Sequence, residues 1–379
     1  MFLRDRTAWP AMPIVFPPAA ISDLLSNQHK QALSDCQTCQ CGDTTTFGLY
    51  QQCFLFCNWP KAALEQAPMT QYSNIFNQQP MILASRASLL AIAQVQIVAD
   101  RLAPIPVDLL KLTTSGDNIL DRSLADAGGK GLFIKELESS VLSGYADAAV
   151  HSLKDMETSF ASGTCLAAVL PREDRRDALV GPFSSLADLP QGAVIGTSSV
   201  RRRALLLHHR PDLEIRLLRG NVNTRIAAMR EGRFDAIILA MAGLRRLGLD
   251  VTHSPISPDI MPPSAGQGAL AIQARNADDS RSQAMVDAAA SIGCATTTAE
   301  VTAERSLLGR LDGSCRTPIA ASATLHPDGK LHLDGMILST DGSKAFRDSL
   351  TGVASDAVQI GVALAEQLLG AAGGRDFLA

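Results

Sequence analysis

From Met81 onward, short apolar runs of strand length alternate with longer amphipathic runs, and this alternation restricts the folds open to the chain. The runs at 81–85, 107–112 and 146–153 are predicted strands. The stretch behind the first strand has apolar residues at helical spacing, and GLFIKELESSVLSG (131–144) is a predicted amphipathic helix. Strands that alternate with helices indicate βαβ units around a mostly parallel sheet.

A second set of alternating elements begins near residue 192. Strands are predicted at 192–196, 214–218 and 235–240, and helices at 198–209, 223–232 and 243–248. The first of these helices is expected to be capped by Ser198 or Ser199. The Pro-rich span from Ser254 to Pro263 is predicted to be a connector, and GQGALAIQAR (266–275) is predicted to be a further strand.

The last part of the chain changes character. A predicted helix over 296–311 precedes three short strands at 319–325, 330–338 and 343–350, with the turn signals PDG and TDG between them. A helix over 354–370 closes the chain. Tight turns between consecutive strands indicate antiparallel pairing, so the sequence predicts two α/β units followed by a small α+β unit.

These patterns also suggest domain boundaries. We expect residues 79–172 together with 266–288 to form domain 1, an α/β domain. Residues 173–265 are expected to form domain 2, also α/β, and residues 289–379 to form the α+β domain 3.

Residues 1–78 are expected to be a disordered or non-native N-terminal extension, with Met69 or Met81 as a plausible true start. This extension contains five cysteines, Cys36, Cys39, Cys41, Cys53 and Cys57, and their spacings are compatible with a zinc site. No helix or strand pattern surrounds them, and the stretch is rich in Gln, Thr and Pro, which favours the extension over the zinc site.

Charge and composition argue against two classes of partner. The chain carries 34 Lys+Arg against 38 Asp+Glu, whereas general binders of nucleic acid or membrane surfaces usually carry a basic excess. Aromatic residues make up only 4% of the chain, so stacking platforms for single-stranded nucleic acid are not expected. No apolar run reaches the roughly eighteen residues of a membrane span. We therefore expect neither a nucleic acid nor a membrane partner.

Basic side chains recur where predicted strands end and helices begin. The set comprises Arg86, Lys154, Arg201, Arg202, Arg219, Arg225 and Arg246. The carboxyl ends of parallel strands meet at one edge of the sheet, where open α/β folds bind ligands and helix N-termini favour anions. One such arginine is usually a solvated surface charge, and Arg203 is interpreted in that way. Recurrence in two α/β halves instead predicts a small polyanion bound between two domains.

Three further residues have chemistry of their own. Asp155 stands beside Lys154 and faces the basic set, which suits stabilising a positive intermediate or handling protons near an amine. His151 is interpreted as a satisfied core histidine rather than a catalytic group. Cys315 lies in the turn DGSC beside Arg316, where a thiol can act as a nucleophile or an attachment point. Taken alone, Cys315 is more simply an ordinary loop cysteine.

Eight motifs together resemble one family, porphobilinogen deaminase, also called hydroxymethylbilane synthase. They are LASRASLLA, GGKGLFIKELE, HSLKDMET, GTSSVRRRALL, LRGNVNTR, AIILAMAGLRRLGL, GQGALAI and ERSLLGRLDGSCRTPIA, in that order. The resemblance covers about residues 80–379.

The resemblance implies a transferase of porphyrin and haem biosynthesis. Such an enzyme joins four porphobilinogen units head to tail with loss of ammonia and releases hydroxymethylbilane by hydrolysis. A covalently bound dipyrromethane cofactor primes the chain. The resemblance also implies two periplasmic-binding-protein-like (type II) α/β domains plus a small α+β C-terminal domain, no metal, and a monomer in the cytoplasm.

The family's functional residues are transferred by motif position. Asp155 is then the catalytic aspartate, and Cys315 holds the dipyrromethane through a thioether. The other implied cofactor-binding residues are Lys154, Ser199, Arg201, Arg202 and Arg225, and the implied substrate-binding residues are Arg86, Ser88, Arg219, Arg246, Lys130 and Phe133. Each pyrrole carries acetate and propionate arms, which arginine forks can hold. Ser115 and Asp126 stand where some family members carry a basic residue.

One alternative remains open, a non-catalytic two-lobed anion-binding protein. That class shares the two-lobed α/β plan, but it gives Cys315 no reason to carry a pyrrole adduct.

Overall fold

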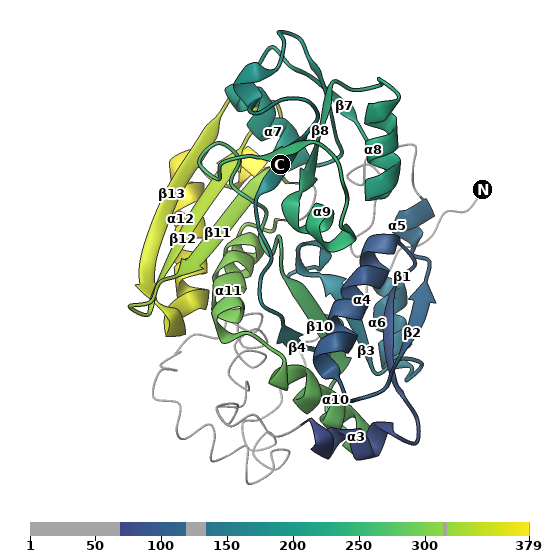
Figure 1. The fold of residues 1–379 in the computed structure, drawn as a ribbon. Coiled ribbons are helices and arrows are strands. Elements are labelled where there is room, and N and C mark those ends of the chain that lie inside the picture. The colour runs from purple at the N-terminus through teal and green to yellow at the C-terminus, as the bar shows by residue number, and fades with distance from the viewer. Residues whose placement is uncertain (1–68, 119–133, 314–316, 379) are drawn as a thin grey trace, which may run out of the picture. The chain divides into compact units, whose positions relative to one another are not determined.

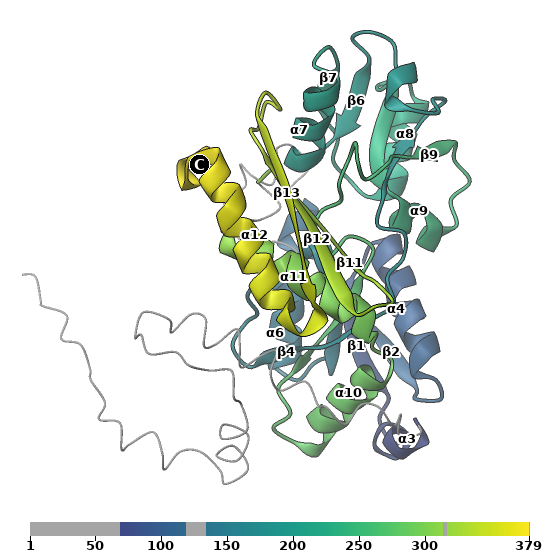
Figure 2. The same ribbon diagram turned by 90° about the vertical axis from the view of Figure 1, so that its left-hand side faces the viewer.

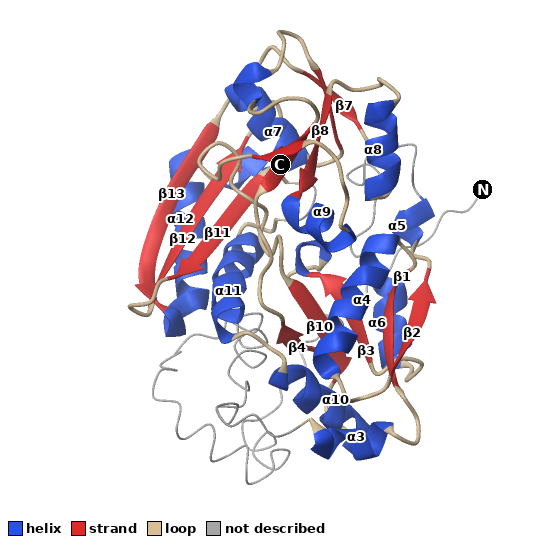
Figure 3. Ribbon diagram, viewed as in Figure 1, coloured by secondary structure: helices blue, strands red, loops and turns tan. Residues whose placement is uncertain are grey.

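The computed structural model describes residues 69–118, 134–313 and 317–378, and these residues form three sheets (Figure 1). Figure 3 marks their strands in red and the surrounding helices in blue. The two larger sheets have five strands each, and the third has three.

The first sheet has the strand order β2-β1-β3-β10-β4. Its strands are β1 (Met81–Arg86), β2 (Val107–Leu112), β3 (Ala148–Ser152), β4 (Thr164–Val169) and β10 (Leu270–Arg275). β1 pairs in parallel with β2 and β3, whereas β10 pairs antiparallel with β3 and β4. The helices that belong with it are α4 (Leu89–Leu102), α5 (Ser115–Asn118), α6 (Lys135–Leu142) and α10 (Ser280–Ser291).

The second sheet repeats this plan, with the order β7-β6-β8-β5-β9. Its strands are β5 (Asp177–Val180), β6 (Val194–Thr197), β7 (Glu214–Leu217), β8 (Ala236–Ala240) and β9 (His253–Pro255). Only β5 runs against its neighbours. The helices are α7 (Val200–His209), α8 (Val222–Arg230) and α9 (Met241–Leu247), with a short 3-10 turn, η3, at Leu186–Asp188.

The third sheet is an antiparallel meander of β11 (Ile319–Leu325), β12 (Lys330–Leu338) and β13 (Ala345–Val353). Its helices are α11 (Ala295–Arg310) and α12 (Ala357–Ala372), followed by the 3-10 turn η5 (Arg375–Leu378). Figure 2 shows α12 running along the sheet. Leu307 of α11, Leu333 of β12 and Leu364 of α12 are fully buried in one shared apolar core, so helices and sheet stabilise each other.

This architecture confirms the expected fold class of two α/β units with mostly parallel sheets and a small α+β unit. The sequence patterns predict no element at β4, β5 or α10, and β9 lies partly within the predicted connector. The helix expected over 131–144 is described from Lys135 to Leu142, and residues 131–133 lie outside the described residues.

An additional helix, α3 (Thr70–Phe76), precedes the first strand. Phe76 has no exposed surface and belongs to the core of the first sheet, and the Arg281 guanidinium lies 4.8 Å from its ring centroid. Arg281 also forms an ion pair with Asp147, at 2.6 Å. The extension expected over 1–78 thus ends in a packed helix. Its residues 1–68, including the five cysteines of the zinc alternative, lie outside the described residues.

Candidate functional site

Local capping places several of the predicted site residues at the ends of strands. β1 ends at Arg86, and the Ser88 hydroxyl oxygen then accepts the Ala91 N–H at 3.3 Å to start α4. After β6, the Ser199 hydroxyl oxygen accepts the Arg202 N–H at 3.4 Å to start α7. A hydroxyl that accepts in a cap still has its own hydrogen to donate. Ser88 and Ser199 can therefore cap a helix and also bind a ligand oxygen.

Lys154 and Asp155 lie on the 3-10 turn η2 (Leu153–Asp155), which follows β3 directly. Leu153 is fully buried and anchors this turn, while Lys154 and Asp155 are half-buried. The anchored turn therefore holds an ammonium and a carboxylate side by side at the end of a central strand.

Electrostatic contacts bring most of the predicted residues together. Lys154 is close enough to Arg201, Arg202, Asp155 and Asp177 for their charges to act on it. Arg225 is similarly influenced by Arg86, Arg202, Arg219 and Asp155. We call this group the cationic cluster; its members are Arg86, Lys154, Arg201, Arg202, Arg219 and Arg225 with Asp155 and Asp177.

The cationic cluster is under electrostatic stress. Burial, reinforced by Arg202, lowers the pKa of Lys154 from 10.5 to about 8. Burial, reinforced by Arg202 and Arg219, lowers the pKa of Arg225 to about 10. Both directions mean that the surroundings oppose the positive charge. An anionic ligand would relieve that opposition.

Asp177, at the start of β5, is a site residue that the sequence analysis missed. Its side chain has no exposed surface, and Arg201 and Arg202 each approach one of its oxygens to 2.7 Å. Although burial opposes ionisation, these two guanidinium groups hold the pKa of Asp177 well below its usual range. An aspartate that opens the apolar strand ALV is a signal that sequence reasoning could have used, because buried charges are almost always paired.

The paired arginines of α7 are therefore partly committed to the protein. Arg202 donates to Asp177 and to the Ile238 carbonyl, at 2.9 Å. Arg201 donates to Asp177 and to the Pro262 carbonyl, at 2.6 Å, while its buried Nε has no hydrogen-bond partner among the described residues. Arg203 is exposed, as expected of a surface charge.

Arg246 is not joined to the cationic cluster by the contacts of the described residues. Its guanidinium donates to the Gly268 carbonyl, at 2.6 Å, and Glu173 is the charged group that influences it. Burial lowers its pKa to about 10. Of the other predicted residues, Lys130, Phe133 and Cys315 lie outside the described residues, as does Asp126, whereas Ser115 donates to a carboxylate oxygen of Glu136.

His151 is a core residue, as predicted, and its side chain contacts Gln273. It is only 6% exposed, and its Nε2 has no hydrogen-bond partner among the described residues. Burial lowers the pKa of His151 from 6.5 to about 4; Gln273 opposes this shift and Arg86 adds to it. The imidazole is therefore neutral near pH 7.

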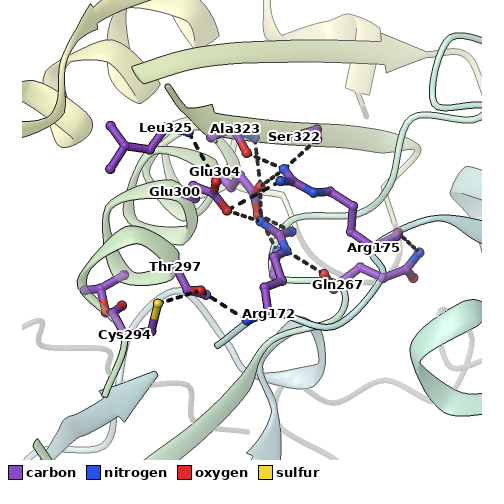
Figure 4. A network of polar contacts seen from close by, with 12 residues as sticks. Arg172, Arg175, Gln267, Cys294, Thr297, Glu300, Glu304, Ser322, Ala323 and Leu325 are labelled. Atoms are coloured by element: carbon purple, nitrogen blue, oxygen red, sulfur yellow. Dashed lines mark hydrogen bonds and ion pairs between the residues drawn. The ribbon is translucent and has the colours of Figure 1, made fainter. Parts of the chain in front are cut away.

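A second group of buried charges lies between the β4–β5 connection, α11 and β11 (Figure 4). Arg172 approaches a carboxylate oxygen of Glu304 to 2.7 Å, and both Arg172 and Arg175 lie 3.5 Å from Glu300. Glu304 also accepts the backbone N–H groups of Gly266 and Ala323, both at 2.8 Å. We call these two arginines and two glutamates the arginine–glutamate network. Two arginines face two glutamates, so its charges balance. The network therefore serves to hold the β4–β5 connection against α11.

The described residues contain no group of three or more His, Cys, Asp or Glu side chains placed to hold a metal ion. Within the same ranges, no helix is both long enough and apolar enough to cross a membrane.

Together these features suit a ligand with several carboxylates. Guanidinium groups pair with carboxylates in a bidentate manner, and six cationic side chains surround only two carboxylates in the cationic cluster. Asp155 is the half-buried carboxylate of the two, so it is the one that can meet positive charge on a ligand. The residues therefore fit a polycarboxylate that also bears or develops a cation.

Comparison with known proteins shows which family the chain is similar to. The family model described as "Porphobilinogen deaminase, dipyromethane cofactor binding domain" matches residues 81–283, and "Porphobilinogen deaminase, C-terminal domain" matches residues 298–370. The chain is 46% identical over 301 residues to a porphobilinogen deaminase of Trichlorobacter lovleyi, which covers 78% of this chain and 95% of that relative. A relative of the same name from Nitrobacter hamburgensis is 45% identical over 303 residues, covering 78% and 94% of the two chains.

Among solved structures, the VFT2 domain of Bordetella pertussis BvgS (a double mutant) is 14% identical, with a TM-score of 0.35. It covers 60% of this chain and 95% of that chain. A likeness this weak places no ligand in the present chain.

Proposed function

The chain belongs to the porphobilinogen deaminase family, and from this premise we propose that it joins four porphobilinogen units head to tail. Each addition releases ammonia, and the product, hydroxymethylbilane, is freed by hydrolysis. The observation that carries this proposal is the cationic cluster, six basic side chains around two carboxylates at the strand ends.

The charge balance of the cluster matches such a substrate. Every pyrrole unit carries an acetate and a propionate, so each addition brings two more carboxylates to the site. Arg86, Arg219 and Arg225 supply guanidinium groups that pair with carboxylates, and Ser88 supplies a hydroxyl donor. We propose that these residues hold the substrate, together with Arg246, Lys130 and Phe133 from neighbouring segments.

Asp155 is proposed as the catalytic carboxylate. Positive charge develops on the aminomethyl group of porphobilinogen as ammonia leaves, and a fixed carboxylate beside that group lowers the free energy of the charged state. The same oxygens can accept hydrogen bonds from pyrrole N–H groups. The buried Leu153 keeps the η2 turn in place, which presents the carboxylate in a fixed orientation.

The matched family domain is a dipyrromethane cofactor-binding domain, and the cationic cluster fits a group with four carboxylates. When bound, dipyrromethane supplies the pyrrole carbon to which the first porphobilinogen is joined. We propose that Cys315 anchors it as a thioether and that Lys154, Ser199, Arg201, Arg202 and Arg225 bind its carboxylates. Arg201 Nε has no hydrogen-bond partner within the described ranges, which supports a ligand contact for that residue.

We further propose that the three domains divide this work. Domain 1 (79–172 with 266–288) supplies Asp155 and Lys154, and domain 2 (173–265) supplies the arginines of α7 and α8. Domain 3 (289–379) carries the cofactor cysteine. The sheets support this division, because β1–β4 with β10, β5–β9 and β11–β13 form separate sheets. We also propose a monomer that acts in the cytoplasm, which light scattering after gel filtration and cell fractionation would test.

Incubation of the purified protein with porphobilinogen tests the activity directly. We expect hydroxymethylbilane, detected as uroporphyrin after cyclisation and oxidation. Folded protein that carries its cofactor and forms no product would refute the proposal. A non-catalytic anion-binding protein is the outcome that this result would favour, although the family membership does not favour it.

Intact mass spectrometry tests the anchor residue. We expect a covalent dipyrromethane on the protein as isolated, and further discrete additions after limited porphobilinogen. Cys315→Ala is expected to remove the dipyrromethane mass. An unchanged adduct in that variant would mean that another residue holds the cofactor.

A further inference from the structure

Gln267 has a fully buried side chain that contacts Lys154 of η2 and Asp177 at the start of β5. It lies in the turn Gly266–Gly268, where both glycines have positive φ, +71° and +88°. A Cβ at Gly268 would come within 2.4 Å of the Glu173 carbonyl oxygen, so only glycine fits there. The main-chain oxygen of Gln267 accepts a hydrogen bond from Arg172 Nε at 2.9 Å (Figure 4). The turn therefore holds Gln267 in a fixed place.

The side-chain amide of Gln267 connects residues of both sheets. Its Nε2 donates to the Arg175 carbonyl at 2.8 Å and to Asp177 Oδ1 at 2.9 Å. Its Oε1 accepts from Lys154 Nζ at 3.2 Å. These hydrogen bonds thus connect Lys154, which follows β3 in the sequence, through Gln267 to Asp177 at the start of β5.

The orientation of this amide is determined by its partners. A rotation by 180° would turn Oε1 toward the Arg175 carbonyl and the Asp177 carboxylate, which can only accept hydrogen bonds. Such an arrangement leaves buried acceptors facing one another, at a cost that the present orientation avoids. Oε1 is therefore kept pointing at Lys154.

The charges around Lys154 explain why a neutral acceptor is useful there. Arg201 and Arg202 of α7 oppose its positive charge, while Asp155 of η2 and Asp177 of β5 support it. A carboxylate in place of the amide would pair with the ammonium and compete with a ligand carboxylate. An amide oxygen orients the ammonium and leaves its charge available.

We propose that Gln267 is a positioning residue that directs the Lys154 ammonium toward the carboxylates of the ligand and locks it to the Asp177–Arg201–Arg202 group. This role rests on the proposed function of the cationic cluster. It predicts that changes at Gln267 act through Lys154, and that they alter the proton affinity of that amine even when no substrate is present.

Competitive labelling of Lys154 with trace acetic anhydride at a series of pH values, read by peptide mass spectrometry on the full-length holoenzyme, tests the proposal. Gln267→Glu is expected to raise the labelling midpoint by about one pH unit, since an opposite charge at hydrogen-bond distance favours the charged amine. Gln267→Met removes the acceptor and is expected to lower the midpoint. The matched control is Gln273→Met, another fully buried glutamine, whose amide contacts Glu138 and Thr164 and not Lys154.

Steady-state kinetics provide the second readout. For Gln267→Met we expect kcat/KM to fall about ten-fold, the loss of one charge-assisted hydrogen bond, with the alkaline limb of its pH profile moved to lower pH. An identical Lys154 midpoint in the wild type and both Gln267 variants would overturn the proposal. If the protein formed no product at all, labelling would still report on Lys154, so failure of the proposed function remains distinguishable from failure of this role.

Discussion

The cationic cluster and the arginine–glutamate network both bury arginines, but they differ in charge balance. The network pairs Arg172 and Arg175 with Glu300 and Glu304. The cluster, among the described residues, gathers six basic side chains around Asp155 and Asp177. Gln267 connects the two, because its main-chain oxygen accepts from Arg172 and its amide contacts Lys154 and Asp177.

The pKa shifts of the buried arginines reflect this difference in charge balance. Burial opposes the charge of Arg172, yet Glu304 and Glu300 together outweigh burial and raise its pKa. Burial also opposes the charge of Arg225, and there the neighbouring arginines act in the same direction and lower its pKa. Both network arginines are paired with buried glutamates, although burial and Arg172 still lower the pKa of Arg175. These ion pairs fasten the segments between the sheets. The members of the cluster carry more positive than negative charge, which suits the binding of anions.

Replacement of the half-buried carboxylate of the cluster should have the largest effect. For Asp155→Asn we expect kcat to fall about 10⁴-fold, because the amide cannot stabilise positive charge at the reacting group. The unfolding free energy should stay near that of the wild type. Steady-state turnover of porphobilinogen measures the effect, with Asp278→Asn, an exposed aspartate, as the matched control. Near-normal turnover would remove Asp155 from the catalytic role.

Breaking the network should cost stability instead. Glu304→Gln leaves the buried Arg172 without its main counter-charge, so we expect a loss of about 4 kcal/mol in unfolding free energy. Urea denaturation measures this loss. The control is Glu366→Gln, which breaks the exposed Arg310–Glu366 pair and should cost under about 1 kcal/mol. Equal losses in the two variants would contradict the fastening role of the network.

The pH dependence of stability tests whether His151, beside the cluster, resists protonation in the folded protein. The pKa of His151 is about 4 in the folded protein and 6.5 in an ordinary setting, so the unfolded chain binds this proton more readily. The stabilisation is fully present above pH 6.5 and is lost as the pH falls toward 4, by roughly 3 kcal/mol in total. His151→Gln should flatten this part of the stability curve, whereas His326→Gln, at an exposed position, should leave it unchanged. A curve of wild-type slope in His151→Gln would assign the acid sensitivity to other groups.

The smallest effect on stability is expected from a change within the cluster. Arg225→Gln removes one of several like charges, so the unfolding free energy should remain unchanged or rise by about 1 kcal/mol. Covalent incorporation of dipyrromethane, measured by intact mass, should fall in the same variant, because a carboxylate of the incoming cofactor loses its partner.

Local patterns account for the parts of this comparison that the sequence could predict. The alternation of apolar runs located β1, β3, β6 and β8, and the serine caps placed the arginines of α7 at a helix start. The pairing of Asp177 with Arg201 was not predictable in this way, because the two residues are 24 positions apart and meet only through the sheet. The roles of Gln267 and Glu304 depend on still longer separations, up to 113 and 132 positions.

For Arg246 and His151, the sequence predicted the position of the residue but not its contacts. Arg246 sits at the expected kind of position, just past a central strand, yet its contacts lead to Gly268 and Glu173 rather than to the cluster. For His151, burial was predictable from its strand, but hydrogen-bond satisfaction depends on the exact placement of Gln273 on the neighbouring strand.

The most direct test of this account is a pair of urea unfolding curves, for Arg225→Gln and Arg172→Gln, both in a Cys315→Ser background without covalent cofactor. Arg225→Gln is expected to unfold at a free energy equal to or above that of the background protein, because it relieves repulsion in the cluster. Arg172→Gln is expected to lose about 4 kcal/mol of unfolding free energy, because it leaves the buried Glu304 without its main counter-charge. A loss for Arg225→Gln as large as that for Arg172→Gln would mean that the cluster serves the fold, and it would contradict the claim that its surplus charge exists for a ligand.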